Sequence, residues 1–241
     1  MKTIAFIPAR YAATRFPGKL MQMLGDKTII RHTYENTKNT LLFDEVIVVT
    51  DSEIIFNEII GNGGYAIMSK KNHESGTDRI AEAVANIEVD LVINVQGDEP
   101  FVKKELLQDL LNAFKNDPKE EIKVASLMHR IVNEQIIGNP NHVKVVVDKN
   151  NTALLFSRSV IPFHRDKNRL PVYYKHIGIY AFRKNILMNF TQWETTPLEA
   201  MEKLEQLRYL ENGVKIKMVL TAESPVSIDT PDDLERARKF I

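Results

Sequence analysis

The feature that most constrains the fold is the alternation of short apolar segments with longer helix-like ones between residues 3 and 95. The apolar segments are rich in β-branched residues, as strands buried on both faces are, and cover residues 3–7, 45–50, 65–68 and 90–95. The helix-like segments between them cover residues 28–38, 52–60 and 77–87. This alternation predicts an α/β fold in which right-handed crossovers connect a parallel sheet. Ligands of such sheets bind beyond the carboxyl ends of the strands, so the loops there are candidates for the site.

The pattern changes from about Lys123 onward, where the segments favour longer and more exposed strands. They cover residues 126–131, 143–148 and 153–158, and the polar turns that join them indicate an antiparallel or mixed sheet. Residues 165–169 read as a charged loop, residues 198–210 as one helix, and Pro231 as the start of a last helix. We expect a single domain of 241 residues, with a first part at roughly 1–122, a second at 123–220 and a returning segment at 221–241.

Charge and composition exclude several classes of protein. Lys plus Arg and Asp plus Glu both number 32, so no net field attracts nucleic acid or an anionic membrane, and any anion site must be built locally. The chain contains no cysteine, which excludes disulfides, thiolate nucleophiles and cysteine-based zinc sites. Its first residues are unlike a signal peptide, and it has no apolar run of about 18 residues. We therefore expect a cytoplasmic protein with no nucleic-acid partner and no membrane insertion.

The loop after the first strand, PARYAATRFPGK, carries three cations, Arg10, Arg15 and Lys19, and leads toward a helix. Backbone NH groups and fixed cations in that position can hold a polyphosphate. The two arginines suit forked contacts with phosphate oxygens, and Lys19 suits a point charge on the transferring or leaving group. The loop matches neither the P-loop nor the dinucleotide-binding pattern, and a solvated basic loop is the alternative interpretation.

Two aspartates, far apart in the sequence, are candidates for a metal site. Asp98 follows the fourth strand in VINVQGDEP, where Gly97 lets the backbone turn, and Asp229 precedes the last helix in SIDTPDDLE. Both aspartates can instead be turn or helix-capping residues. Asp232 and Asp233 are interpreted as helix-start residues.

The segment HESGTDRI, after the third strand, provides small hydrogen-bonding residues at a helix start, namely Ser75, Gly76 and Thr77. Arg79 can support the site or pair with an acid, and a structural role is the simpler interpretation of His73. Gln96 can hydrogen-bond to a nucleotide or a sugar.

Several of these motifs closely resemble those of the CMP-sugar synthetases, and in particular of the 3-deoxy-D-manno-octulosonate (Kdo) cytidylyltransferases. They are IPARYAATRFPGK, HESGTDRI, QGDEP, NHVKVVVD with FSRSVIP, YYKHIGIYAF, LEAMEKLEQLR and IDTPDDLE. The resemblance runs from Ile7 to Leu234. One departure is that the family continues PGKPL, whereas here Lys19 is followed by Leu20 and Met21.

The resemblance implies a three-layer, Rossmann-like nucleotidyltransferase fold with a mostly parallel central sheet and a smaller mixed α/β subdomain for sugar binding and dimerisation. It implies transfer of CMP from CTP to the anomeric C2 hydroxyl of Kdo, with release of pyrophosphate, for lipopolysaccharide biosynthesis. It also implies a homodimer and Mg²⁺ held by Asp98 and Asp229, which suits the preference of this ion for carboxylate and phosphate oxygens.

Carried over residue by residue, the resemblance assigns catalysis to Arg10, Arg15, Lys19, Asp98 and Asp229. It assigns nucleotide binding to Pro8, Ala9, Arg10, Arg15, Lys19, Ser75, Gly76, Thr77, Arg79 and Gln96. It assigns sugar binding to Gln96, Arg158, His176, Tyr180, Glu205 and Gln206, with Glu202 as a weaker candidate. Without the resemblance, Tyr180 reads as a core residue, His176 as a satisfied strand residue, and Glu202 and Glu205 as a solvated helix face.

Three alternatives stay open from the sequence. A cytidylyltransferase for another acid sugar, such as 8-amino-Kdo or a sialic acid, would need the same carboxylate and hydroxyl recognition. A nucleotide-sugar glycosyltransferase would usually carry an Asp-x-Asp motif, which QGDEP is not. A nucleotide- or sugar-binding module without chemistry is the third, although the two aspartates and three cations are all present.

Overall fold

The computed structural model describes residues 1–12, 16–73, 75–166, 168, 170–222 and 226–241. The chain forms two compact units, each built from separate stretches of sequence. Unit 1 comprises Met1–Gln108, Arg183–Met188 and Pro225–Ile241, and unit 2 comprises Asp109–Phe182 and Asn189–Ser224. The sequence analysis expected a division near residue 122, whereas unit 1 ends its first stretch at Gln108.

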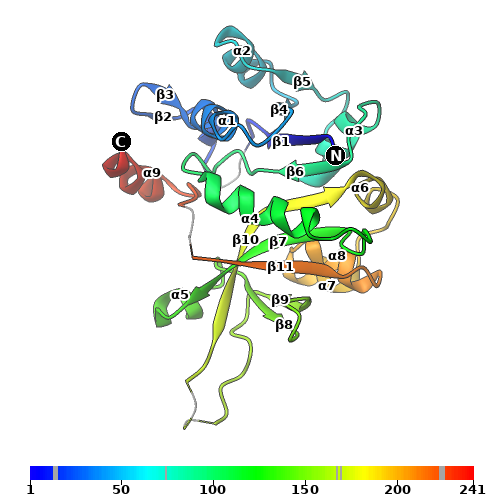
Figure 1. The fold of residues 1–241 in the computed structure, drawn as a ribbon. Helices are drawn as coiled ribbons and strands as arrows, with labels where there is room; N and C mark the ends of the chain where they lie inside the picture. The colour runs from blue at the N-terminus through cyan, green and yellow to red at the C-terminus, as the bar shows by residue number, and fades with distance from the viewer. Residues whose placement is uncertain (13–15, 74, 167, 169, 223–225) are drawn as a thin grey trace. The chain divides into compact units, whose positions relative to one another are not determined.

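A parallel sheet of four strands forms the centre of unit 1, in the order β6-β1-β4-β5 (Figure 1). The strands are β1 (Thr3–Ala9), β4 (Glu45–Thr50), β5 (Ala66–Met68) and β6 (Leu91–Asn94). Successive residues of β1, from Ile4 to Ile7, have no exposed surface, so both faces of the strand are covered. This burial is the physical reason for the continuous apolar runs, and the predicted parallel sheet is confirmed.

Two helices that pack on the sheet of unit 1 begin at hydrogen-bonding caps. Thr28 caps α1 (Ile29–Asn39) by accepting from the NH of Arg31, and Ser75 caps α3 (Gly76–Val84) by accepting from the NH of Asp78. Both helices pack against β1 and β4. Other elements of this unit are η1 (Lys19–Met21), β2 (Met23–Leu24), β3 (Lys27–Thr28), α2 (Glu53–Gly61), α9 (Pro231–Ala237) and η2 (Arg238–Phe240).

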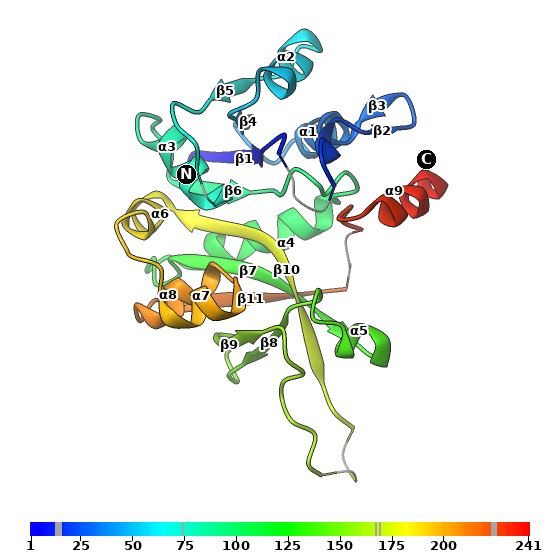
Figure 2. The same ribbon diagram turned by 180° about the vertical axis from the view of Figure 1, so that it is seen from behind.

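Unit 2 contains a mixed sheet, as the change of sequence pattern predicted. Its strands are β7 (Val124–Ile131), β8 (Lys144–Val147), β9 (Ala153–Ser157), β10 (Tyr173–Arg183) and β11 (Ile216–Thr221). β10 is antiparallel to β7 and to β8, β8 is antiparallel to β9, and β11 is parallel to β7. Figure 2 shows the β8–β9 hairpin and the long connection from β9 to β10.

The helix predicted at residues 198–210 is wrong as a single element. The structure has two helices there, α7 (Pro197–Glu202) and α8 (Gln206–Glu211). Lys203 ends α7 because it adopts the left-handed conformation, with φ 53° and ψ 49°, in which a right-handed helix cannot continue.

Three further helices, α4 (Lys104–Lys115), α5 (Glu134–Gly138) and α6 (Lys184–Phe190), have no counterpart among the predicted elements. In α4 the apolar side chains Leu107, Leu110, Leu111 and Phe114 are buried at the spacing of one helix face.

Candidate active site

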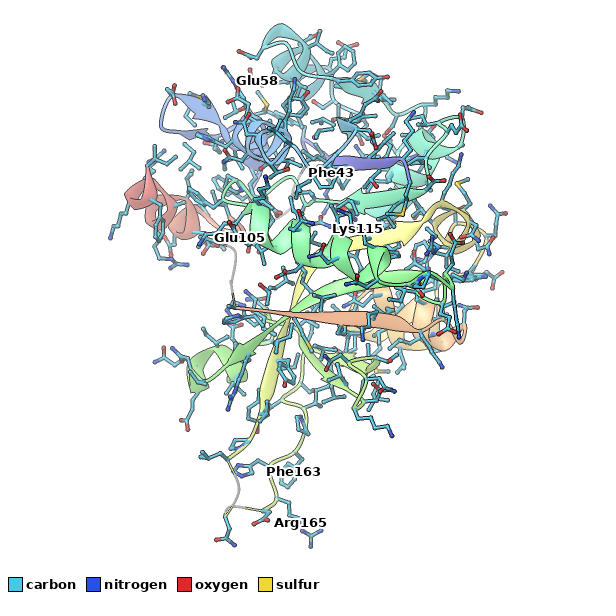
Figure 3. The ribbon with its side chains drawn as sticks, viewed as in Figure 1. Phe43, Glu58, Glu105, Lys115, Phe163 and Arg165 are labelled. Carbon is cyan, nitrogen blue, oxygen red and sulfur yellow. The ribbon has the colours of Figure 1, made fainter. Side chains whose placement is uncertain are left out.

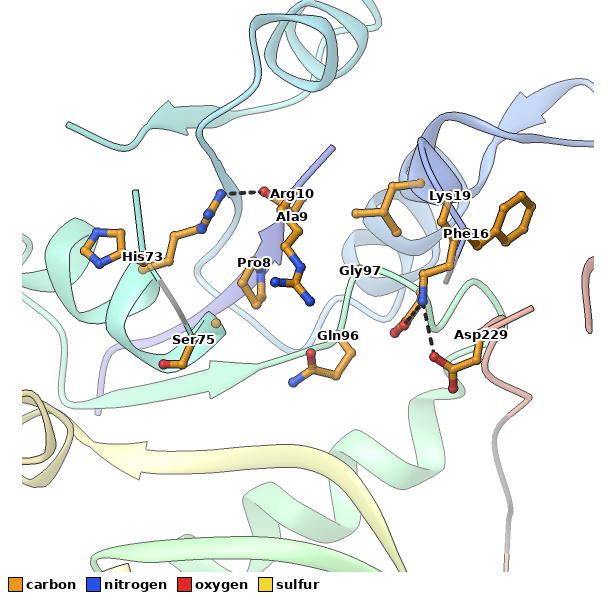
Figure 4. Close-up of a pocket in the computed structure, with 14 residues that line it drawn as sticks. Pro8, Ala9, Arg10, Phe16, Lys19, His73, Ser75, Gln96, Gly97 and Asp229 are labelled. Carbon is orange, nitrogen blue, oxygen red and sulfur yellow. Dashed lines mark hydrogen bonds and ion pairs between the residues drawn. The ribbon is translucent and has the colours of Figure 1, made fainter. Parts of the chain in front are cut away.

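A pocket of about 360 Å³ lies in unit 1, beyond the carboxyl ends of β1 and β6 (Figure 4). Its lining comes from four segments that the sequence analysis singled out: the first loop, the HESGTDRI segment, the QGDEP loop and the segment before α9. The lining residues are Pro8, Ala9, Arg10, Phe16, Lys19, Leu20, His73, Ser75, Gly76, Arg79, Gln96, Gly97, Asp98 and Asp229. The fold therefore brings together segments that lie up to 221 residues apart, between Pro8 and Asp229.

Two glycines allow these segments to approach β1. A Cβ atom on Gly97 would lie 3.1 Å from the carbonyl oxygen of Pro8 and 3.2 Å from a methyl of Leu20. A Cβ atom on Gly76 would lie 3.1 Å from the ring of Pro8. Larger residues at these positions would push the QGDEP loop and the start of α3 away from the end of β1, so the glycines set the width of the pocket.

The two candidate metal-binding aspartates lie on either side of one lysine. The ammonium nitrogen of Lys19 is 2.5 Å from Oδ2 of Asp98 and 3.3 Å from Oδ1 of Asp229. A dashed line in Figure 4 marks the contact between Lys19 and Asp229. The backbone NH of Ile228 donates to the carbonyl of Asp98 at 3.0 Å, which joins the two acidic segments. Burial acts to lower the pKa of Lys19, but the charge and hydrogen bonds of Asp98, followed by those of Asp229, outweigh it and raise that pKa.

This arrangement fits a divalent cation of the magnesium type. A cationic group already lies within hydrogen-bonding distance of both carboxylates, so their oxygens converge on one position. Within the described residues no group of three or more His, Cys, Asp or Glu side chains could hold a metal. A pair of aspartates therefore needs further oxygen ligands, which phosphates and water supply in magnesium sites.

Arg79 lines the pocket, but its guanidinium is bound within the protein. It donates to the carbonyl of Ala9 at 2.7 Å and to Oδ2 of Asp51 at 2.6 Å, and its residue is only 2% exposed. The hydrogen bond from Arg79 is the main reason that the pKa of Asp51 lies below its usual value. These contacts tie α3 to the ends of β1 and β4, so Arg79 shapes the pocket edge.

The start of α3 provides the polar wall of the pocket. The hydroxyl of Ser75 accepts from the NH of Asp78 at 3.0 Å and donates to the carboxylate of Asp78 at 2.8 Å. Thr77 is buried and does not line the pocket. His73 does line it, and its Nε2 lies 2.6 Å from a carboxylate oxygen of Glu82, which fixes the loop to α3.

The first loop is described only in part. Arg10 is exposed at the pocket, whereas Arg15 lies outside the described residues. Phe16 and Leu20 line the pocket but were absent from the predicted site. Their sequence signal is that they lie near Lys19 in the motif. An apolar residue in a loop does not by itself indicate a binding site.

Two of the predicted sugar-binding residues lie together in unit 2, on β10. The rings of His176 and Tyr180 have centroids 5.3 Å apart, and Nε2 of His176 lies 2.9 Å from the hydroxyl of Ser126. Burial lowers the pKa of His176 to about 3, and burial followed by the charge of Glu205 raises that of Tyr180. Both side chains are therefore neutral at physiological pH.

The other predicted sugar-binding residues of unit 2 flank α7 and α8. Glu205 precedes α8, and Gln206 is its first residue and is buried. The guanidinium of Arg158 donates to the carbonyls of Glu202, Pro140 and Lys203, at 2.8, 3.1 and 3.4 Å. Gln96, also predicted to bind sugar, lies in unit 1.

The carboxylate of Glu202 holds the chain around Arg158. It accepts from the hydroxyl of Ser157 at 2.5 Å and from the backbone NH of Arg158 at 3.0 Å. The buried Lys144 donates to the backbone carbonyl of Arg158 at 2.5 Å. Glu202, the weaker candidate for sugar binding, therefore stabilises the backbone around Arg158.

The sequence of the chain is similar to those of known cytidylyltransferases. Residues 4–216 match the cytidylyltransferase family. The 3-deoxy-manno-octulosonate cytidylyltransferase of Flavobacterium johnsoniae is 61% identical over 241 residues, which cover 100% of this chain and 99% of that protein. The protein of the same name from Christiangramia forsetii is 56% identical, over 100% of this chain and 97% of that protein. Within the described residues, no helix is long and apolar enough to cross a membrane.

Comparison with solved structures also finds cytidylyl-transferring enzymes. The structure of CMP:2-keto-3-deoxy-manno-octonic acid synthetase complexed with CTP matches with a TM-score of 0.93 and 38% identity, over 100% of this chain and 98% of that one. A 4-diphosphocytidyl-2C-methyl-D-erythritol synthase from Anaerococcus prevotii, at 17% identity and a TM-score of 0.65, shares the fold. The chain belongs to the 3-deoxy-manno-octulosonate cytidylyltransferase family of nucleotidyltransferases.

Proposed function

We propose that the protein transfers CMP from CTP to the anomeric C2 hydroxyl of Kdo, giving CMP-Kdo and pyrophosphate for lipopolysaccharide biosynthesis. The observation that carries this proposal is the unit 1 pocket, which is lined by Arg10, Lys19, Asp98 and Asp229. The chain that forms this pocket is 61% identical to a Kdo cytidylyltransferase. In the reaction, the C2 oxygen forms a bond to the α-phosphorus of CTP. The bond from that phosphorus to the bridging oxygen breaks, pyrophosphate leaves with the electron pair, and the hydroxyl proton is released.

The residues of the pocket supply positioning and charge. Arg10 binds phosphate oxygens from the exposed rim, and Lys19 offsets charge on the transferring phosphoryl group or on pyrophosphate. The capped start of α3 offers Ser75 and the backbone of Gly76 as hydrogen-bonding groups for the nucleotide. Arg79 acts through Ala9, because its bond to that carbonyl holds the end of β1 at the pocket edge.

Asp98 and Asp229 would hold Mg²⁺ in this proposal. When bound there, the ion would neutralise phosphate charge and act as a Lewis acid toward the reacting oxygens. The support for this assignment is the convergence of both carboxylates on the ammonium of Lys19. Neither carboxylate is assigned as a dedicated general base.

The sugar would be recognised by residues of unit 2, and Gln96 stays a sugar-binding candidate of unit 1. His176 and Tyr180 offer neutral donors and acceptors, which suit a substrate rich in hydroxyl groups, and Gln206 adds an amide. Arg158 supplies the cation for the sugar carboxylate, and Glu205 accepts from hydroxyl groups.

We also propose that the protein is a cytoplasmic homodimer. Phe163, labelled in Figure 3, lies in the long connection from β9 to β10. It is 85% exposed, and Leu170 in the same connection and Val132 near the end of β7 are 91% and 81% exposed. A groove of about 510 Å³ is lined by Val132, Ile137 and Leu170, among others. Exposed apolar side chains of this size favour a protein partner, and a second copy of the chain is the partner that the family resemblance implies.

The dimer is tested by light scattering after gel filtration. Wild type should have the mass of two chains, and the double variant Phe163→Asp/Leu170→Asp should have the mass of one. Leu41→Asp is the matched control, because Leu41 is 85% exposed in unit 1 and its replacement should leave the mass unchanged. A monomeric wild type would contradict the proposal.

The activity is tested by pyrophosphate release from CTP and Mg²⁺ with Kdo, 8-amino-Kdo or N-acetylneuraminate, against a control without sugar. We expect Kdo to give the highest kcat/KM. A preference for 8-amino-Kdo or the sialic acid would change the substrate but keep the reaction. Binding of CTP without sugar-dependent release from folded protein would instead favour a binding module.

A further inference from the structure

Lys19 is the movable member of the group that it forms with Asp98 and Asp229. The carbonyl of Asp98 accepts from the NH of Ile228, and the NH of Asp229 donates to the carboxylate of Asp233 at 3.1 Å. Both aspartates are thus fixed through their backbones. The Lys19 ammonium, in contrast, stands at the end of a flexible stem of four methylene groups, whose bonds can rotate while the backbone stays in place.

The ammonium and a divalent cation need the same oxygens. Lys19 contacts Oδ2 of Asp98 at 2.5 Å and Oδ1 of Asp229 at 3.3 Å, and its side chain is only 13% exposed. A divalent ion bound by those carboxylates would stand within a few ångströms of the ammonium, where solvent screening is weak and like charges repel strongly. Both cations cannot hold their best positions at once.

We propose that Lys19 competes with the divalent cation for Asp98 and Asp229, and that the nucleotide removes this competition by taking Lys19 onto its phosphates. Lys19 would then couple the two ligands, so that nucleotide raises the affinity for metal and metal raises the affinity for nucleotide by the same factor. This inference rests on the metal assignment of the proposed function, and it makes Lys19 a switch as well as a phosphate ligand.

The first test measures Mn²⁺ binding by electron paramagnetic resonance, without nucleotide, on the purified full chain. Lys19→Met keeps the length of the side chain and removes its charge, so this variant should bind Mn²⁺ on the order of tenfold more tightly than wild type. Lys27→Met is the matched control, because Lys27 pairs with Glu35 outside the pocket, and it should bind Mn²⁺ as wild type does. Asp98→Asn should bind the ion more weakly than wild type. Circular dichroism checks that each variant is folded.

The second test adds α,β-methylene-CTP, which cannot transfer CMP. The analogue should tighten Mn²⁺ binding more in wild type than in Lys19→Met, because only wild type has an ammonium to displace.

The results separate this inference from the proposed function. Mn²⁺ binding by Lys19→Met that is equal to or weaker than that of wild type would overturn the competition alone. A wild type that fails to bind Mn²⁺ even with the analogue would overturn the metal assignment as well. Neither measurement contains the acceptor sugar, so neither result bears on the sugar specificity, which the pyrophosphate assay tests.

Discussion

Arg79 binds Asp51 at 2.6 Å and the carbonyl of Ala9 at 2.7 Å, so one buried guanidinium joins the carboxyl ends of β1 and β4. Asp51→Asn should leave this guanidinium without its charged partner and destabilise the protein by about 1–3 kcal/mol. It should also raise the KM for CTP, because the end of β1 carries Pro8, Ala9 and Arg10 into the pocket. Urea denaturation and initial rates at varied CTP measure the two effects.

The control for this prediction is Glu35→Gln, which breaks the partly exposed pairs of Glu35 with Lys27 and Arg31. Exposed ion pairs contribute about 0–1 kcal/mol, and Glu35 lies outside the pocket, so the KM for CTP should not change. If Asp51→Asn matched this control in both stability and KM, Asp51 would have no positioning role.

The buried His176 should make the protein less stable in mild acid. Its pKa in the folded state is about 3, below the 6.5 of an exposed histidine, because burial disfavours the charged ring. His176 therefore binds a proton less readily in the folded state than in the unfolded chain. The stability contribution is complete above pH 6.5 and is lost as the pH falls toward 3, by about 1 kcal/mol per pH unit.

His176→Gln keeps a polar side chain that does not titrate in this range. The free energy of unfolding of wild type should therefore fall more steeply between pH 6.5 and pH 4.5 than that of the variant. Parallel curves for the two proteins would show that His176 is protonated equally in the folded and unfolded states.

The carboxylates of Asp98 and Asp229 should matter for turnover far more than for folding. Asp98→Asn and Asp229→Asn each remove one charge from the pair around Lys19, and kcat should fall on the order of a hundredfold or more. Thermal melts should show folded protein in each case. Wild-type turnover in either variant would remove that aspartate from the catalytic group.

Lys203 gives a prediction about the fold itself. Its left-handed conformation is one that glycine adopts without strain, so Lys203→Gly should stabilise the protein by about 0.5–1 kcal/mol. Lys203→Val should destabilise it, because β-branched residues disfavour positive φ. The backbone carbonyl that accepts from Arg158 stays in both variants. A more stable valine variant would contradict the account of why α7 ends here.

The parallel core of unit 1 could be predicted from sequence because its strands are covered on both faces. Burial of consecutive residues, as from Ile4 to Ile7, produces an apolar run that no surface segment would carry. The loops that carry Arg10, Ser75 and Asp98 could be predicted once the strands were located, because ligands of parallel sheets bind beyond the carboxyl ends of the strands.

Other features depend on contacts between distant segments and leave little trace in the local pattern. The break at Lys203 interrupts apolar positions whose spacing suits one continuous helix. Arg79 makes its hydrogen bonds within the protein with Asp51, which is 28 residues away in sequence, and with the backbone carbonyl of Ala9. A backbone carbonyl leaves no sequence signature. The pairing of Asp98 with Asp229 came from the family resemblance, because each aspartate alone reads as a cap. Their common contact with Lys19 was not predicted and comes from the structure.

The most direct test of the central claim is phosphorus NMR of a reaction with CTP, Mg²⁺ and Kdo labelled with ¹³C at C2. The account predicts one new phosphodiester resonance, coupled to the labelled carbon, and an equal amount of pyrophosphate. Pyrophosphate accompanied by free CMP, or a new phosphodiester without coupling to that carbon, would contradict transfer to the anomeric hydroxyl.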